Sequence, residues 1–233
     1  MAKAKPFIKW VGGKSQLIEK LDAQLPADFG NWENVTYIEP FVGGGAMLFY
    51  MLQRYPNIQH AIINDINPDL ATCYRTVRDT PEQLIESLRD IENAYLAIET
   101  EDGRKDFFMA ARERYNEKNL DPIENSTKFF FLNRTCFNGL YRVNKKGFFN
   151  VPFGKYSNPT ICDPETIRKD SELLQRVEIL NSDFEATFEH AHGDTLFYFD
   201  PPYRPLSDTS SFNDYSKEAF NDDAQIRLKA VSY

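Results

Sequence analysis

The sequence predicts an α/β protein with a doubly wound, parallel β-sheet covered by helices. Short β-rich runs alternate with stretches that carry apolar residues at helical spacing, an order typical of parallel sheets with right-handed crossovers. One of these runs, at residues 195–200, is nearly all apolar, which suits a strand covered on both faces. The chain has 233 residues, of which 42% are hydrophobic, so it can bury one sizeable core.

The first half of the sheet is predicted by a strand, a turn, a helix and a strand in succession. The β-rich run VTYIE leads towards three consecutive glycines, and a helix candidate and a second β-rich run follow. Prolines at a first helical position, where their missing N–H costs nothing, predict helices that start at Asn67-Pro68 and Thr80-Pro81. The predicted elements are a strand at 35–39, a turn at 43–45, helices at 46–55 and 70–78, and a strand at 58–65.

The middle of the chain predicts a lobe inserted into this sheet. Residues 82–119 are charged and amphipathic and indicate helices, and a further helix is predicted at 127–136 after Asn125-Ser126. Residues 141–151 place a polar turn that ends in Gly147 between two β-rich arms, as a hairpin requires. Strands at 176–183 and 195–200 and a helix at 216–233 complete the chain. The expected domains are residues 1–75 together with 160–233, and residues 76–159 for the lobe.

Composition excludes several classes of protein. No apolar stretch is long enough for a secretion signal or a membrane span. The three cysteines, Cys73, Cys136 and Cys162, are far apart, so neither a disulfide framework nor a zinc ribbon can be built, and the three histidines lack metal-ligand spacing. We therefore expect a cytoplasmic protein that holds no metal ion.

Charge is distributed unevenly along the chain. The formal net charge of −8 argues against a polyanionic partner, yet residues 128–158 hold six basic, nine aromatic and no acidic residues. Such a mixture is expected of a surface that holds phosphates and stacks rings on bases. The alternative is a basic, aromatic-rich packing segment.

Two motifs stand at predicted strand ends, where doubly wound sheets bind ligands. In EPFVGGGA, at residues 39–46, consecutive glycines allow a sharp turn and a close approach by a ligand. Asp65, after the next strand, stands where an acid that binds ribose hydroxyls is expected. Alternatively, Asn64 and Asp65 cap the helix that follows.

The second motif, Asp200-Pro201-Pro202-Tyr203, combines a carboxylate, outward carbonyls and an aromatic ring. The prolines remove two backbone donors, so the carboxylate and a carbonyl form an acceptor pair beside the ring. Such a pair suits a planar group that carries an NH2. The alternative is a turn that only terminates the strand.

Near the amino terminus, Gly12-Gly13-Lys14 does not match a phosphate-binding loop. These glycines can still present N–H groups to an anion such as a carboxylate, with Lys14 as the countercharge. Trp10 is either part of the core or a cover for a cofactor.

Five motifs, taken in order, resemble the Dam-type (class D12, α-group) DNA adenine-N6 methyltransferases over nearly the whole chain: KWVGGK, EPFVGGGA, Asn64-Asp65, FLNRTCFNGLYRVNKKGFFNVPFGKY and FDPPY. The resemblance implies an AdoMet-dependent methyltransferase (Rossmann-like) sheet, a DNA-recognition lobe, S-adenosylmethionine (AdoMet) as cofactor and double-stranded DNA as partner. The residues implied at the AdoMet pocket are Trp10, Lys14, Glu39, Phe41, Gly43, Gly45, Asp65 on the ribose, Asp183 and Phe184 on the adenine, and Asp200. Asp183 could equally cap a short helix.

The resemblance also assigns the DNA-contacting and catalytic residues. Arg134, Lys145 and Lys146 would grip phosphates, Lys9, Asn138, Leu140 and Arg142 would approach base edges, and Phe137 would wedge into the opened duplex. Asp200 and the Pro201 carbonyl would accept both N–H groups of an extruded adenine, whose ring Tyr203 would hold. Pro202 belongs to the same motif, and the methyl group would pass in line from the sulfonium of AdoMet.

The leading interpretation is therefore methylation of adenine N6 in duplex DNA, with GATC as the expected site. Cytosine N4 is another exocyclic amine with the same needs, and a non-catalytic DNA- or AdoMet-binding remnant is the alternative of a different class. Family members usually continue with further strands, whereas this chain ends at Tyr233, so the strand at 195–199 is expected at an apolar edge. We accordingly expect a truncated polypeptide or a partner chain that completes the sheet.

Overall fold

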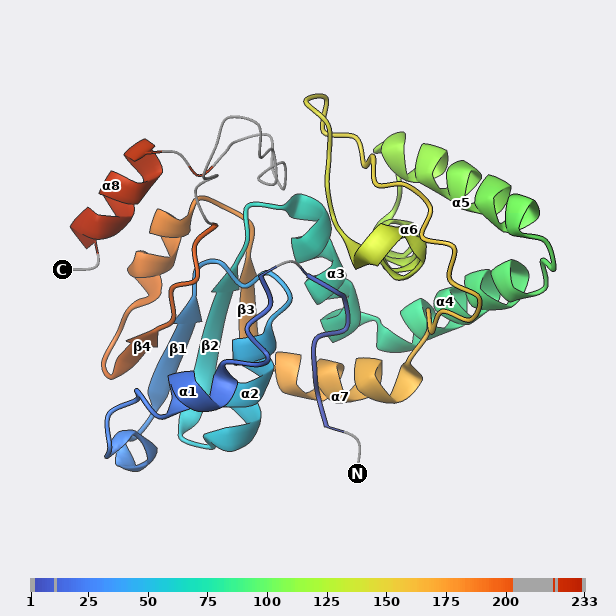
Figure 1. Cartoon of the computed structure of the whole chain (residues 1–233). Helices are drawn as coiled ribbons and strands as arrows, with labels where there is room; N and C mark the ends of the chain where they lie inside the picture. The colour runs from blue at the N-terminus through green and yellow to red at the C-terminus, as the bar shows by residue number, and fades with distance from the viewer. Residues whose placement is uncertain (1–2, 11, 203–219, 221, 232–233) are drawn as a thin grey trace.

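A parallel four-stranded sheet lies at the centre of the computed structural model, which describes residues 3–10, 12–202, 220 and 222–231. The strand order is β3-β2-β1-β4, with β1 (Val35–Glu39), β2 (Ile58–Asn64), β3 (Val177–Leu180) and β4 (Thr195–Phe197). Figure 1 shows this sheet on the left with helices around it and a second group of helices on the right. The predicted α/β class with a parallel sheet is confirmed.

All four strands lie within the predicted β-rich runs, but three of them are shorter than predicted. β1 spans its predicted residues, β2 stops one residue early, and β3 and β4 cover only part of the runs at 176–183 and 195–200. β3 and β4 are the two outer strands among the described residues, and each pairs there with one neighbour. The expected edge position of residues 195–199 is therefore present in this part of the chain.

Two of the helices around the sheet, α2 and α3, begin at the turns that the sequence indicated, whereas α1 and α7 were not predicted, and the predicted residues 216–219 and 221 of the last helix lie outside the described residues. The proline-started helix α3 is capped by Asn67, whose side-chain oxygen accepts the N–H groups of Asp69 and Leu70 at 3.0 and 3.2 Å. The helices of this group are α1 (Ile18–Asp22), α2 (Ala46–Arg54), α3 (Pro68–Asp79), α7 (Pro164–Leu174) and α8 (Asp222–Val231). Short 3-10 turns are η1 (Phe29–Asn31), η2 (Phe137–Gly139) and η3 (Phe184–His190).

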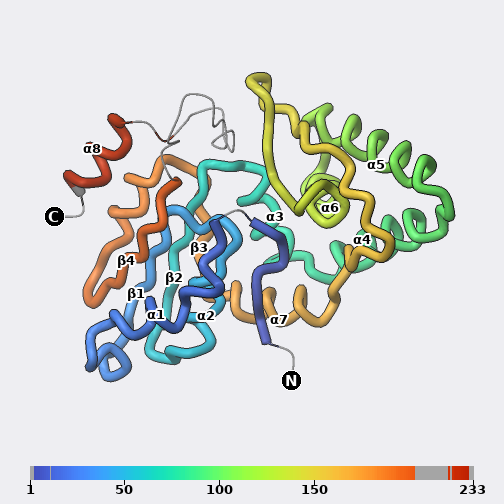
Figure 2. Tube along the Cα trace, viewed as in Figure 1, coloured from blue at the N-terminus to red at the C-terminus, as the bar shows by residue number. Residues whose placement is uncertain are grey.

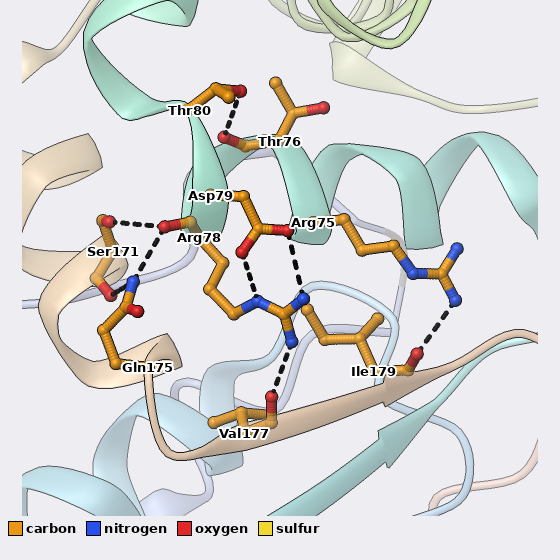
Figure 3. A network of polar contacts seen from close by, with 9 residues as sticks. All are labelled: Arg75, Thr76, Arg78, Asp79, Thr80, Ser171, Gln175, Val177 and Ile179. Atoms are coloured by element: carbon orange, nitrogen blue, oxygen red, sulfur yellow. Dashed lines mark hydrogen bonds and ion pairs between the residues drawn. The ribbon is translucent and has the colours of Figure 1, made fainter.

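The outer edge of β3 is covered by two arginines of α3 (Figure 3). Arg78 Nη1 donates to the carbonyl of Val177 at 3.0 Å, and Arg75 Nη2 donates to that of Ile179 at 2.9 Å. The hydroxyl of Ser171, on α7, donates to the Arg78 carbonyl at 3.0 Å. These bonds satisfy carbonyls that an edge strand would otherwise leave open, and they attach α3 and α7 to the sheet.

The second group of helices comprises α4 (Pro81–Leu96), α5 (Glu101–Asn116) and α6 (Pro122–Thr135), which Figure 2 traces beside the sheet. The predicted start of α6 at residue 127 is wrong. Asp121 caps this helix earlier, because its carboxylate accepts the N–H groups of Ile123 and Glu124 at 2.9 and 3.0 Å. α6 packs against α3, α4 and α5 and so joins the two groups. The domain boundaries stay a prediction, and the one between residues 75 and 76 falls inside α3.

The predicted hairpin is present as a tight turn with a single antiparallel bridge between Val143 and Phe149. The N–H of Gly147 donates to the Asn144 carbonyl at 2.8 Å, and Gly147 has a φ of +80°, which suits glycine. Backbone hydrogen bonds flank this bridge, from the Asn144 N–H to the Phe148 carbonyl at 2.9 Å and from the Asn150 N–H to the Arg142 carbonyl at 3.1 Å. Asn116 of α5 binds the backbone groups of Phe149 that point away from the opposite arm. Its amide accepts the Phe149 N–H at 2.8 Å and donates to the Phe149 carbonyl at 3.0 Å.

Asp170 is a buried carboxyl group that makes the fold sensitive to pH. It is fully buried on α7, accepts the N–H of Lys5 at 3.0 Å, and its Oδ2 has no hydrogen-bond partner among the described residues. Burial raises the pKa of Asp170 to about 8. In the unfolded chain, an aspartate ionises at about pH 4. Between about pH 4 and about pH 8, Asp170 therefore keeps its proton in the folded chain but loses it in the unfolded chain. The stability of the fold consequently falls as the pH rises through this range.

Replacing Asp170 with asparagine is therefore expected to stabilise the protein at pH 8 by at least about 1 kcal/mol, with a smaller gain at pH 5. Urea unfolding at the two pH values measures this. The control Asp90→Asn, at an exposed position of α4, should change neither value. A pH-independent difference between Asp170→Asn and the wild type would contradict the assignment.

Candidate active site

The predicted site residues gather at the carboxyl ends of neighbouring strands. Glu39 ends β1, Asp65 follows β2, and Asp200 follows β4. Because β1 lies between β2 and β4 and all three run in parallel, these carboxylates come to the same edge of the sheet. This is the edge at which doubly wound sheets bind ligands.

The glycine-rich turn packs against Trp10. A methyl group at Gly43 would come within 2.7 Å of the indole ring, and one at Gly44 within 3.0 Å of the Trp10 Cβ. The Trp10 side chain thus approaches this turn closely, and the close approach of a ligand stays a prediction. Trp10 also stacks on Tyr141 at 5.3 Å, so it connects the turn to the segment that follows α6.

Gly45 is required both for its backbone angle and for space. Its φ is +72°, and an added Cβ would lie 2.5 Å from the Tyr74 hydroxyl and 3.3 Å from the Phe49 ring. Gly193 has a φ of +62° but no atom within 4 Å of an added Cβ.

We expect Gly45→Ala to lower the free energy of unfolding by about 3 kcal/mol, because it adds a buried clash to backbone strain of about 1 kcal/mol. Gly193→Ala, which carries the backbone strain alone, should cost only about 1 kcal/mol. Urea denaturation compares the two variants. Equal losses would show that the contact with Tyr74 is unimportant.

Asp65 ties the glycine turn to the end of β2. One carboxylate oxygen accepts the N–H of Gly43 at 3.2 Å, and the other accepts that of Asn67 at 2.9 Å. Loss of water contact raises the pKa of Asp65 to about 6, although these two bonds oppose the rise. The alternative that Asn64 and Asp65 cap α3 is wrong, because Asn67 is the cap. Contact of Asp65 with a ribose stays a prediction.

Two buried polar side chains support the turn from below. Glu39 accepts a hydrogen bond from the Tyr37 hydroxyl at 2.9 Å, and burial raises its pKa to about 8. Asn64 donates to the carbonyls of Pro40 and Ser182, at 3.1 Å each, and so links the ends of β1, β2 and β3. Glu39 thus lies inside the core under the turn, and its predicted contact with a cofactor remains a prediction.

Phe41 and Phe184 are in direct contact, with ring centroids 5.4 Å apart. No third ring fits between them, and Phe220 contacts both rings, at 5.6 Å from Phe41 and 6.2 Å from the buried Phe184. Contact of this pair with an adenine stays a prediction. Arg227 of α8 lies 5.0 Å from the Phe184 ring, and its guanidinium donates to both oxygens of Asp183 at 3.1 and 3.0 Å. Asp183 also accepts the N–H of Glu185 at 3.0 Å, so it does cap η3, as the alternative held.

Asp200 is held by Lys14. The Lys14 ammonium donates to the two carboxylate oxygens at 2.8 and 2.7 Å and to the Gly12 carbonyl at 2.9 Å. Their side chains are 17% and 23% exposed, which makes the pair partly shielded from water. Of the residues that follow Asp200, Pro201 is half-buried, Pro202 is exposed, and Tyr203 lies outside the described residues.

Most of the predicted DNA-contacting residues lie on the surface. Phe137 is 51% exposed, and Arg142 is exposed with its Nε donating to Asn150 at 2.7 Å. The other residues at the surface are Lys9, Asn138, Lys145 and Lys146, while Leu140 is half-buried. Arg134 differs, because its guanidinium turns inward and donates to the Phe7 carbonyl at 2.6 Å. Its grip on a phosphate stays a prediction.

Asn133 is a positioning residue that the sequence analysis did not single out. It is 2% exposed. Its amide accepts the Lys9 N–H at 2.8 Å and donates to the carbonyls of Lys9 and Gly139 at 2.8 and 3.0 Å. The signal in the sequence is an amide inside the apolar helix FFFLNRT, a place where a buried polar group needs partners. Asn133 thus fixes the amino-terminal segment to the segment that carries Phe137 and Asn138.

Two general features accompany this site. None of the helices in the described part of the chain is long and apolar enough to cross a membrane. Among the same residues, no three His, Cys, Asp or Glu side chains gather as a metal site would require.

Comparisons with known proteins agree with this geometry. The family model for D12 class N6 adenine-specific DNA methyltransferases matches residues 10–232. The type II methyltransferase M.MjaIII of Methanocaldococcus jannaschii is 47% identical over 226 residues, which cover 96% of this chain and 78% of that protein. The type II methyltransferase M1.LlaDCHI of Lactococcus lactis subsp. cremoris is 38% identical and is covered to 75% by 97% of this chain. The DNA adenine methylase of Vibrio cholerae is 35% identical, with 100% of this chain covering 77% of it.

The family match confirms the interpretation as an adenine-specific enzyme, and the cytosine N4 alternative finds no support in it. Both the extent of the match and the identity to these relatives are well above what chance similarity produces. The chain therefore belongs to the D12 class of N6 adenine-specific DNA methyltransferases.

Proposed function

We propose that this chain takes its methyl group from AdoMet and transfers it to N6 of an adenine that has left the duplex stack, with GATC as the recognised sequence. The observation that supports this best is the position of Asp200 and Pro201 at the end of β4, beside the glycine turn that ends β1. A carboxylate and a carbonyl there form an acceptor pair for an exocyclic amine.

The chemistry of the side chains at this edge fits AdoMet. Asp65 offers a carboxylate to ribose hydroxyls, Asp183 and the half-buried ring of Phe41 suit an adenine, and Lys14 suits a carboxylate. The bound cofactor would supply a methyl group on a positively charged sulfur. Trp10 and the turn from Gly43 to Gly45 would border the same pocket.

The proposed task of Asp200 follows from the electronics of the substrate. The lone pair of an adenine amine is delocalised into the ring, which makes the nitrogen a poor nucleophile. Hydrogen bonds from its two N–H groups to Asp200 and the Pro201 carbonyl favour a more tetrahedral nitrogen with an available lone pair. The chain's own contribution is alignment and charge, because no covalent intermediate with the protein is needed. Extrusion of the base costs a few kcal/mol beforehand.

The hairpin and η2 supply the proposed DNA surface. Lys145 and Lys146 lie in the exposed polar turn of the hairpin, and Arg142 lies on the arm before that turn. Phe137 of η2 is 51% exposed. We assign phosphate binding to the two lysines and base reading to Arg142, because its guanidinium can donate two hydrogen bonds to guanine O6 and N7.

Incubation of duplex DNA with radiolabelled AdoMet, followed by nearest-neighbour analysis, tests the proposal. We expect labelled N6-methyladenine within GATC. Labelled N4-methylcytosine would overturn the assignment of the base, and label in another sequence would overturn GATC. The absence of label despite salt-sensitive DNA binding would support a non-catalytic remnant.

Arg142→Ala is expected to reduce discrimination between GATC and a singly substituted site by about 1–3 kcal/mol, because it removes a bidentate contact to one guanine. Lys145→Ala should instead weaken binding to all sequences equally and lower the salt dependence. The ratio of kcat/KM values on the two duplexes measures the first effect. Uniform weakening by Arg142→Ala would reassign it to phosphate binding.

A further inference from the structure

The Lys14–Asp200 pair occupies the proposed acceptor of the target adenine. One ammonium donates to both oxygens of Asp200, at 2.8 and 2.7 Å, and the two residues are 186 positions apart in the sequence. With side chains 17% and 23% exposed, the pair is better shielded than the surface ion pairs of this chain, such as Lys155 with Glu101 at 64% and 59%. Because water screens this pair less than it screens exposed pairs, its attraction is stronger than theirs.

The contact opposes the task proposed for Asp200. A carboxylate makes the adenine amine more nucleophilic because it carries a negative charge and accepts the N–H groups. An ammonium 2.8 and 2.7 Å from the two oxygens neutralises that charge and occupies the atoms that would accept the hydrogen bonds of the adenine. Productive binding of the base therefore requires Lys14 to leave Asp200.

The backbone around Lys14 permits such a change. Lys14 follows Gly12 and Gly13, Gly12 has a φ of +82°, and no atom lies within 4 Å of a Cβ added to Gly12. Lys14 also precedes α1, which begins at Ile18, so it lies outside the helices and strands, and its neighbours Gly13 and Ser15 are exposed. Its side chain can be directed elsewhere without moving the sheet.

Charge balance indicates what draws Lys14 away. AdoMet, which the proposed function places at this edge, has a sulfonium cation that would come near Asp200 and a carboxylate that Lys14 suits. A second cation at Asp200 would then be repelled, while a new anion becomes available. Lys14 can therefore exchange the carboxylate of Asp200 for that of the cofactor with little net change in free energy.

We propose that Lys14 is an exchangeable cation that holds Asp200 until the carboxylate of the cofactor takes its place, so that the adenine binds Asp200 only after the cofactor. This inference rests on the proposed function. It makes Lys14 a positioning residue that couples the two binding events. By linkage, each ligand raises the affinity for the other by the same factor, for which about fivefold or more is expected.

The test uses the full chain and a substrate duplex with 2-aminopurine at the target adenine, whose fluorescence rises when the base leaves the stack. S-adenosylhomocysteine retains the carboxylate of the cofactor, whereas 5′-methylthioadenosine lacks it. For the wild type, we expect only S-adenosylhomocysteine to raise the fluorescence and to tighten DNA binding about fivefold or more.

Lys14→Gln should show high fluorescence without any cofactor and no further gain on its addition. Lys14→Arg, which retains the charge, should keep the coupling, and Lys20→Gln, on the exposed part of α1, should match the wild type. Equal responses of the wild type to the two nucleosides, or unchanged coupling in Lys14→Gln, would overturn the exchange.

The labelling assay separates this failure from failure of the proposed function. Normal formation of N6-methyladenine by the wild type, together with no coupling, overturns the exchange alone. No methylation and no AdoMet binding by the wild type overturn both.

Discussion

Methyl transfer to DNA is expected to fall about 100- to 1,000-fold in the variant Asp200→Ala, the order of effect seen when a preorganised polar partner of a reacting group is removed. The variant loses the carboxylate that accepts an N–H of the adenine amine, and the Pro201 carbonyl alone cannot hold both hydrogens. Initial rates with radiolabelled AdoMet measure the effect. DNA affinity at fixed salt should change little, because the proposed phosphate contacts are made by Lys145 and Lys146 of the hairpin and not by Asp200.

The matched control is Asp194→Ala, an exposed aspartate just before β4 whose side chain is not part of the site. It should retain wild-type rates. Circular dichroism and urea unfolding establish that both variants fold. Undiminished methylation by folded Asp200→Ala would refute the catalytic assignment, whereas loss of DNA binding together with activity would point to a structural role.

Asn133→Ala is expected to lower the free energy of unfolding by about 3 kcal/mol and to abolish specific DNA binding. The substitution removes three hydrogen bonds and leaves the N–H and carbonyl of Lys9 and the carbonyl of Gly139 without their buried partner. Each such group costs about 1–3 kcal/mol when it is left unsatisfied, although relaxation recovers part of that. The segments that carry Lys9 and Phe137 would then lose their common support.

Urea denaturation and gel shifts on a cognate duplex measure the two effects. Asn158→Ala, at an exposed position, is the control and should lie within about 0.5 kcal/mol of the wild type. Asn133→Asp keeps the acceptor for the Lys9 N–H but cannot donate to the carbonyls, so it should be nearly as damaging. A variant that loses stability but binds cognate DNA normally would remove Asn133 from the DNA-binding machinery.

Much of the fold was predictable because its signals are local. β1 matches its β-rich run, α3 starts at Asn67-Pro68, and the hairpin turns at Gly147, since caps, prolines and glycines act on neighbours within about four residues. The predicted start of α6 after Asn125-Ser126 is wrong because Asp121-Pro122, four residues earlier, is an equally good start signal. The predicted lengths of β3 and β4 are wrong because pairing with a neighbouring strand, and not the β-propensity of the residues, determines where these strands end.

The candidate site was predictable as a set of motifs, but the partners of its side chains were not. The glycine turn, Asp65 and Asp200 could be assigned to strand ends, and a parallel sheet brings strand ends together. Nothing local indicates that Arg134 turns inward to the Phe7 carbonyl, or that Arg227 binds Asp183. These contacts join segments far apart in the chain.

The order of residues alone was enough to establish the α/β class, the family resemblance and the chemical types at the strand ends, because these depend on periodicity, on short-range signals and on motif order. Folding in three dimensions added which groups meet: Trp10 over the glycine turn, Asn133 between Lys9 and Gly139, and Lys14 on Asp200. The physical reason is that such pairs depend on the packing of the whole chain. Two sites that are 186 residues apart become neighbours only when β4 lies beside β1 and the amino-terminal segment crosses their ends.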